Sequence, residues 1–219
     1  MEMSRERTID FLAIVPVILF YGIAVIGLLI QSSRLIASGG DLLMLVLAVS
    51  TKLAGAFFLA QQIVLFLIRP LPIAKCRGWL PRAAAVFGAD IGMSLVFLPA
   101  AHLSLFAQFL STLFTFAGTV ASIYVTGILG RSFNVTPQAR AFVERGPYRV
   151  IRHPLYVAEQ AILFGVSLPY RQPWSFLIFL VSLAAQVPRM YFEERVLSQN
   201  IPAYQAYAAR TARILPGLY

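Results

Sequence analysis

The chain has 219 residues, of which 59% are hydrophobic and only 12% are charged. Soluble domains carry a charge on roughly a quarter of their residues, so this composition excludes an ordinary soluble domain. Apolar segments of about 18 residues or more recur, and each is long enough to cross a hydrocarbon core of about 30 Å. The composition therefore predicts an all-α polytopic integral membrane protein, a helical bundle that forms one structural domain.

The formal net charge of +9 raises the question of a nucleic-acid partner. The cations cluster in short segments between the apolar ones, as the positive-inside rule describes, so we expect no nucleic acid. The single cysteine, Cys76, excludes an internal disulfide and a cysteine metal cluster. We therefore also expect no metal site.

In chain order, residues 1–7 predict a short charged tail, and residues 31–41 predict a polar turn. Six segments are expected to be membrane helices: 8–30, 42–68, 83–99, 103–129, 155–168 and 174–187. The last two have only about 14 residues, or about 21 Å at 1.5 Å per residue. We expect them to form a helical hairpin whose second arm continues past Pro188 into a polar helix around Glu193.

The chain changes character near residue 130. Residues 1–129 predict a four-span transmembrane scaffold, and residues 130–219 predict a catalytic region. Fifteen of the 18 lysines and arginines lie in the N-terminal tail, in segments 69–82 and 130–153, and after residue 188. The positive-inside rule then predicts that both termini and the catalytic region face the cytoplasm. A chain with six membrane passes and few loops suggests a protein of a prokaryotic inner membrane.

Two charged residues, Lys52 and Asp90, lie deep within predicted spans. Such groups are costly in hydrocarbon and often functional. Asp90 is expected about 10 Å from the cytoplasmic end of its span. It either makes a structural polar contact or lines a cavity, which makes it a candidate substrate-binding residue. His102 is expected to be an interfacial residue in the outer turn.

The segment 145–156 is polar, basic and interrupted by two prolines. His153 precedes Pro154, and proline suits the first turn of a helix. Exposed amides at a helix N-terminus bind anions, and Arg152 and His153 would add donors there. The alternative is a basic interfacial segment that carries part of the positive-inside charge.

Arg189 and Glu193 are four residues apart, so they share one face of a helix. A solvated ion pair is the alternative to a functional role for these two residues. The sequence carries no G-x-S-x-G, P-loop or G-x-G-x-x-G motif, which leaves hydrolase and dinucleotide-binding functions without support. The residues alone predict an integral membrane protein with a polar site at the cytoplasmic surface of the bilayer.

Five motifs follow one another between about residues 125 and 217. They are LGRSF at 129–133, GPYRVIRHPLY at 146–156, Glu193-Glu194, Tyr204-x-x-Tyr207 and ILPG at 214–217. This ordered set resembles the isoprenylcysteine carboxyl methyltransferase family, whose wider relatives include membrane phospholipid N-methyltransferases. The first 120 residues match that family only in being apolar helices.

The resemblance implies a methyltransferase that uses S-adenosylmethionine, held in a pocket that the C-terminal part closes. It implies cofactor contacts for His153, Pro154 and Tyr156, and catalytic roles for Arg189 and Glu193 at the junction of cofactor and substrate. The residues expected to line or close the pocket are Tyr148, Arg152 and Glu194 on the cofactor side, and Tyr204 and Tyr207 on the substrate side.

The chain departs from this family at Ala158-Glu159, where members often have glycine two residues after the tyrosine. The extra methyl group of Ala158 is expected to narrow the pocket. Glu159 adds an acid within a short helix, and we expect it to bind the ammonium group of the cofactor.

The acceptor that the resemblance names is the carboxylate of an isoprenylated cysteine or a similar lipophilic substrate, which would enter from the bilayer among the membrane lipids. Three alternatives stay open at this point. The first is N-methylation of a phospholipid or a lipophilic amine. The second is an NADPH-dependent membrane sterol reductase, because such enzymes have a similar C-terminal HPxY region. The third is a non-catalytic scaffold whose basic face binds anionic lipid.

Overall fold

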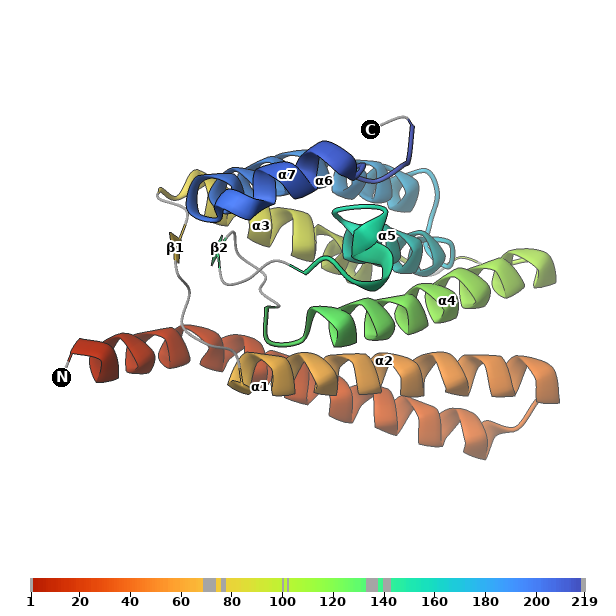
Figure 1. The fold of residues 1–219 in the computed structure, drawn as a ribbon. Coiled ribbons are helices and arrows are strands. Elements are labelled where there is room, and N and C mark those ends of the chain that lie inside the picture. Colours follow the sequence, from red (N-terminus) through yellow and green to blue (C-terminus); the bar gives the residue numbers. More distant parts are fainter. Residues whose placement is uncertain are drawn as a thin grey trace. The chain divides into compact units, whose positions relative to one another are not determined.

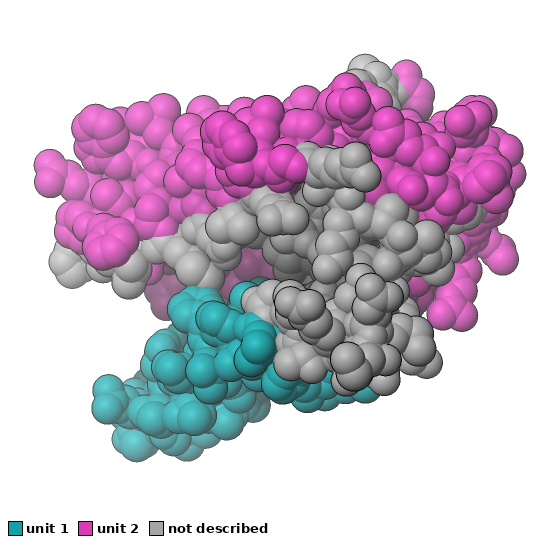
Figure 2. Space-filling model, turned by 90° about the vertical axis from the view of Figure 1, so that its left-hand side faces the viewer, with its two compact units in different colours: residues 1–71 teal, residues 72–219 magenta. Residues whose placement is uncertain are grey.

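The computed structural model describes residues 2–68, 74–75, 78–99, 101, 103–132, 138–139 and 143–217. Within them it has seven α-helices, three 3-10 helices and two strands of two residues each (Figure 1). The chain forms two compact units, residues 1–71 and 72–219 (Figure 2). The predicted all-α class is confirmed, whereas the functional division near residue 130 stays a prediction.

The first unit is a hairpin of two long helices, α1 (Glu2–Ser38) and α2 (Leu42–Ile68). The chain reverses at Gly39 and Gly40, whose φ angles of +67° and +128° suit glycine because it has no Cβ. Asp41 then accepts a hydrogen bond of 3.0 Å from the amide of Met44, which caps the start of α2.

The predicted polar turn at 31–41 was wrong for most of its length, because α1 continues to Ser38. Its polar side chains find partners within the hairpin. Ser32 donates to the carbonyl of Leu28 at 2.8 Å, and Lys52 of α2 donates to Gln31 at 2.9 Å. Polar residues satisfied in this way do not end a helix. The predicted charged tail is also helical from residue 2 onward.

The second unit carries the remaining elements. Its helices are α3 (Leu80–Asp90), α4 (Leu105–Leu129), α5 (Pro154–Ser167), α6 (Trp174–Asn200) and α7 (Pro202–Arg210). The 3-10 helices are η1 (Ile91–Phe97), η2 (Gly130–Ser132) and η3 (Gly146–Arg149). The strands β1 (Ala74–Lys75) and β2 (Gln138–Ala139) pair antiparallel, with Ala74 opposite Ala139.

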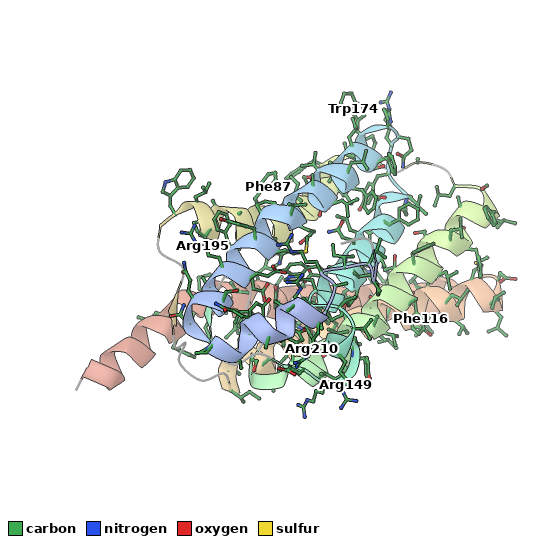
Figure 3. The ribbon with its side chains drawn as sticks, turned by 45° about the horizontal axis from the view of Figure 1, so that its top comes forward. Phe87, Phe116, Arg149, Trp174, Arg195 and Arg210 are labelled. Atoms are coloured by element: carbon green, nitrogen blue, oxygen red, sulfur yellow. The ribbon has the colours of Figure 1, made fainter. Side chains whose placement is uncertain are left out.

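The α5–α6 hairpin is confirmed, and α6 continues past Pro188 as predicted. Figure 3 shows Trp174 and Arg195 toward opposite ends of α6. Helix α5 packs against α4 on one side and against α6 on the other, and α6 also packs against α3. Helix α6 thus carries its polar end to the place where α5 begins.

Four described helical segments are long and apolar enough to cross a membrane: Ile14–Ser38, Leu42–Ile68, Leu105–Leu129 and Trp174–Asn200. The protein is therefore an all-α polytopic membrane protein. The predicted span 83–99 takes another form, since α3 gives way to η1 after 11 residues. Helix α5 has the 14 residues expected for segment 155–168. That both termini and the catalytic region face the cytoplasm, which we inferred from the distribution of cations, stays a prediction.

Close packing of α4 on α5 depends on glycine. A Cβ added at Gly118 would lie 2.8 Å from the amide nitrogen of Ile162 and 2.9 Å from the carbonyl oxygen of Ala158. Both are backbone atoms of α5 and cannot swing away. The buried hydroxyl of Ser111 adds a hydrogen bond of 2.7 Å to the carbonyl of Gly165 across the same interface.

We expect Gly118→Ala to lower the free energy of unfolding by about 1–3 kcal/mol, because the added methyl group forces the two helix backbones apart. Thermal unfolding in detergent measures the effect. Gly22→Ala in α1 is the matched control, since a Cβ there meets nothing within 4 Å among the described atoms. Equal midpoints for the two variants would contradict this account of the α4–α5 contact.

Candidate functional site

The framework of the site is a short parallel pairing between the segment before α5 and the segment after α7. The amide of Arg152 donates to the carbonyl of Ala212 at 2.8 Å, and that of His153 donates to Arg213 at 3.1 Å. The amide of Ala212 donates back to Val150 at 3.2 Å. These bonds hold the start of α5 beside the C-terminal segment.

Glu194 of α6 is the centre of a buried charged cluster. His153 Nε2 lies 3.0 Å from its Oε1, Arg152 Nη1 lies 3.3 Å from its Oε2, and Arg213 Nε donates to Oε2 at 3.1 Å. The Glu194 side chain is only 11% exposed. One carboxylate therefore joins the start of α5, helix α6 and the C-terminal segment.

Glu193 faces a second group of partners. Its Oε2 accepts a hydrogen bond of 2.7 Å from the hydroxyl of Tyr156 and lies 4.0 Å from His153 Nδ1. The rings of His153 and Tyr156 stack, with centroids 5.1 Å apart and planes 15° from parallel. At 39% exposure the Glu193 side chain is the more open of the two adjacent acids. It can receive a ligand, whereas Glu194 is enclosed.

Arg189 is buried, with its side chain only 4% exposed. Its guanidinium carbon lies 4.4 Å from the centroid of the Tyr156 ring, which is cation–π distance. Its Nη1 donates to Gln186 at 2.8 Å and to Glu159 at 3.3 Å. Its Cδ would lie 2.5 Å from a Cβ at Gly88, so only glycine fits there. The guanidinium is thus fixed between α3, α5 and α6.

Three buried tyrosines, Tyr148, Tyr204 and Tyr207, close the site from the side of η3 and α7. Burial raises the pKa of Tyr207 to about 12 and raises the pKa of Tyr148 and Tyr204 well above the ordinary value of 10. All three phenols are therefore protonated at neutral pH. The Tyr207 hydroxyl donates to the carbonyl of Tyr148 at 2.8 Å, which ties α7 to η3.

The structure thus brings together most of the predicted site residues: Arg152, His153, Pro154, Tyr156, Glu159, Arg189, Glu193 and Glu194. Tyr148, Tyr204 and Tyr207 lie at its edge. Two predictions fall on parts left undescribed, namely the side chain of Asp90 and the whole of His102. Their roles stay predictions.

Sequence reasoning missed three residues of the site. Arg213 binds Glu194, Gln186 binds Arg189, and Gly88 makes room for Arg189. The available signals were weak. Gln186 lies three residues before Arg189 on the same helix, and Arg213 is the cation next to the ILPG motif.

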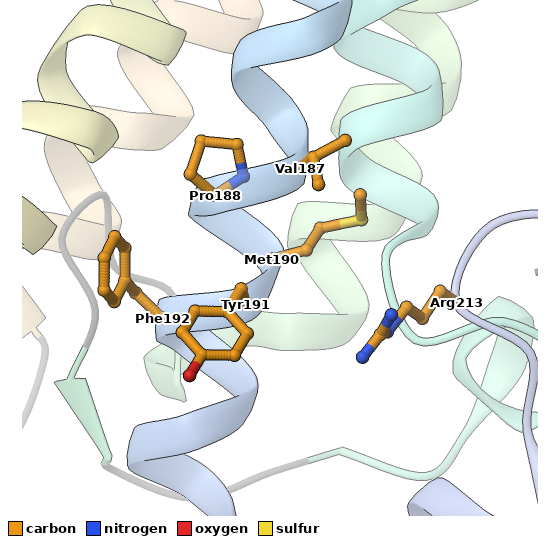
Figure 4. A pocket seen from close by; sticks show the side chains of 6 residues that line it. All are labelled: Val187, Pro188, Met190, Tyr191, Phe192 and Arg213. Carbon is orange, nitrogen blue, oxygen red and sulfur yellow. The ribbon is translucent and has the colours of Figure 1, made fainter.

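An apolar cavity of about 330 Å³ lies beside this cluster. Five of its lining residues come from α6, and Arg213 reaches it from the C-terminal segment (Figure 4). The five are Val187, Pro188, Met190, Tyr191 and Phe192. The same arginine that binds Glu194 therefore borders an apolar space on the face of α6.

The residues of the site fit S-adenosylmethionine, a ligand with a cationic sulfur, an ammonium group and a carboxylate. The partly exposed Glu193 carboxylate suits a cation. Arg152 Nε and Arg189 Nε are buried donors without a hydrogen-bond partner among the described residues, which suits a ligand that carries hydrogen-bond acceptors. Among the residues that the structure describes, no group of three or more His, Cys, Asp and Glu side chains is placed to hold a metal ion.

The sequence matches the model of the phospholipid methyltransferase family over residues 91–203, just over half of the chain. The chain belongs to this family. The matched range includes α4, α5 and α6 with His153, Tyr156, Arg189, Glu193 and Glu194. Membership confirms the resemblance to the isoprenylcysteine carboxyl methyltransferase-like membrane enzymes and supports methyl transfer to a lipophilic substrate.

A second similarity is to the nickel-cobalt-cadmium resistance protein NccN of Alcaligenes xylosoxydans xylosoxydans. The two are 32% identical over 77 residues, which is 35% of this chain and 36% of that protein. The chain thus aligns with about a third of the length of this curated relative.

Proposed function

We propose that this protein transfers the methyl group of S-adenosylmethionine to a nucleophile on a lipophilic acceptor that reaches the site from the bilayer. The observation that carries the proposal is the arrangement of Tyr156, Arg189 and Glu193 beside the Glu194 cluster. It places an open carboxylate and a fixed cation around one tyrosine. Family membership favours this reading over a reductase or a lipid-binding scaffold.

S-adenosylmethionine supplies an electrophilic methyl group on a positively charged sulfur. Transfer of that methyl group to the acceptor would leave the neutral thioether S-adenosylhomocysteine. The protein's own part is to position the two reactants and to keep water from the nucleophile. His153, Arg152 and Glu194 would hold the cofactor side of the site, together with Pro154 and Tyr148.

Two classes of acceptor are candidates for the substrate side of the site. The resemblance suggests the carboxylate of an isoprenylated cysteine, which needs no general base because it is already deprotonated. A lipophilic amine is the second candidate, and the exposure of Glu193 favours it, since this carboxylate can take the proton that the amine loses. Tyr204, Tyr207 and Asp90 are proposed on the substrate side. By the distribution of cations, the site and both termini would face the cytoplasm.

Calorimetric titration with S-adenosylhomocysteine, the product form of the cofactor, tests the proposal on the detergent-purified full chain. We expect micromolar binding to the wild type and a loss of at least about tenfold in His153→Ala, which corresponds to about 1.4 kcal/mol. Glu144→Ala is the control, because Glu144 pairs with Arg210 at the surface. A wild type that is folded by thermal unfolding yet binds no S-adenosylhomocysteine would overturn the proposal.

A further inference from the structure

Glu159 is the carboxylate that the structure places against Arg189. It lies on α5, three residues after Tyr156, so the two side chains share one face of the helix. Its Oε2 is 3.3 Å from Arg189 Nη1, and its side chain is 31% exposed. The contact joins α5 to α6 across 30 residues of sequence.

Arg189 cannot leave this contact by moving its guanidinium to water. Gln186 accepts from the same Nη1, the Tyr156 ring covers one face of the group, and the backbone at Gly88 lies against Cδ. A buried cation held in this way needs a counter-charge, because an uncompensated buried charge costs several kcal/mol. Glu159 supplies that counter-charge in place.

Negative side chains therefore outnumber positive ones around Tyr156. Arg189 and Glu159 cancel on the ring side, and Glu193 adds a negative charge at the Tyr156 hydroxyl. The three side chains of Glu159, Arg189 and Glu193 together carry a formal charge of −1. An anionic acceptor there would compete with Glu159 for Arg189 and would be repelled by Glu193. An amine meets neither obstacle, whether it binds as the ammonium or reacts as the neutral form.

We propose that Glu159 is a specificity-determining residue, which neutralises Arg189 and thereby makes the acceptor side of the site discriminate against anionic acceptors. The inference rests on the proposed function, because it concerns the acceptor side of the same site. It also gives Glu159 a role different from the predicted contact with the ammonium group of the cofactor.

The test compares two probes with the same tail and opposite charge, dodecanoate and dodecylamine. Their affinities for the full chain saturated with S-adenosylhomocysteine are measured in one detergent at pH 8. The variants are Glu159→Gln, which removes the charge and keeps the size, and Glu159→Asp, which keeps the charge. Glu144→Gln removes a surface carboxylate as a control. The partition of each probe into protein-free micelles is measured and subtracted, because the two probes partition differently. The wild-type ratio and its shift in the variants then both refer to binding by the protein.

We expect the wild type to prefer dodecylamine, and Glu159→Gln to shift the ratio of the two affinities about tenfold toward dodecanoate, or about 1.4 kcal/mol. Glu159→Asp and Glu144→Gln should keep the wild-type ratio. A wild type that prefers dodecanoate, or a Glu159→Gln ratio within about twofold of the wild type, overturns the inference. The wild-type preference is decisive even where a variant does not fold. Failure of S-adenosylhomocysteine to bind the wild type would instead overturn the proposed function itself.

Discussion

Replacing Glu194 by alanine is expected to lower the free energy of unfolding by about 3–5 kcal/mol, because the change removes one partner of a buried charged cluster. Arg152, Arg213 and His153 all contact this carboxylate, which is 11% exposed. Without it the guanidinium groups of Arg152 and Arg213 lose the carboxylate that they share, and the C-terminal segment loses a side-chain tie to α6. Denaturant or thermal unfolding in detergent measures the loss.

The matched control for this change is Glu144→Ala. Glu144 also pairs with an arginine, Arg210, but both side chains are well exposed. Exposed ion pairs contribute about 0–1 kcal/mol, so this variant should stay close to the wild type. Glu194→Gln should fall between the two, since it keeps hydrogen-bond acceptance and loses the charge. Similar losses for Glu194→Ala and Glu144→Ala would show that the buried cluster does not hold the fold.

Replacing Glu193 by glutamine is expected to lower the rate of methyl transfer to an amine by about 10²–10⁴-fold, the usual contribution of a general base. Glutamine still accepts the hydrogen bond from Tyr156 but cannot take a proton. At 39% exposure the side chain adds little to packing, so the fold and the affinity for S-adenosylhomocysteine should stay near wild type. The measurement is transfer of a radiolabelled methyl group from S-adenosylmethionine to dodecylamine.

The same variant also separates the two proposed acceptor classes. A carboxylate acceptor such as N-acetyl-S-farnesylcysteine has no proton to lose, so its methylation should fall much less than that of the amine. Glu144→Gln is the control for a general effect of lost charge. An amine rate in Glu193→Gln that stays above about a tenth of the wild-type rate would remove Glu193 from the role of base.

The elements around the site were predictable where local pattern determines them. The hairpin of α5 and α6 follows from two apolar segments bounded by Pro154 and Trp174, and the structure confirms it. The end of α1 was not predictable in the same way. Polar residues after Ile30 indicate a turn, but Ser32 bonds to the preceding helical turn and Gln31 pairs with Lys52 of α2.

The contacts within the site were also not predictable from local sequence pattern. The spacing of Arg189 and Glu193 left an ion pair along α6 as an alternative, whereas the structure pairs Arg189 with Glu159 of α5. Sequence spacing describes neighbours on one helix, whereas this contact depends on the rotation of α5 against α6. The contact of Arg213 with Glu194 likewise depends on how α7 returns the chain to α6, which no local pattern encodes.

The pairing of His153 with Arg213 has a consequence for how the protein is made. The two residues are 60 positions apart in the sequence, yet a backbone hydrogen bond of 3.1 Å joins them. Ribosomes add about 5–20 residues per second, so Arg213 is synthesised about 3–12 s after His153. Glu194 is made 19 residues before Arg213, so it lacks one of its cations for about 1–4 s. The site therefore assembles only once the segment after α7 has emerged from the ribosome.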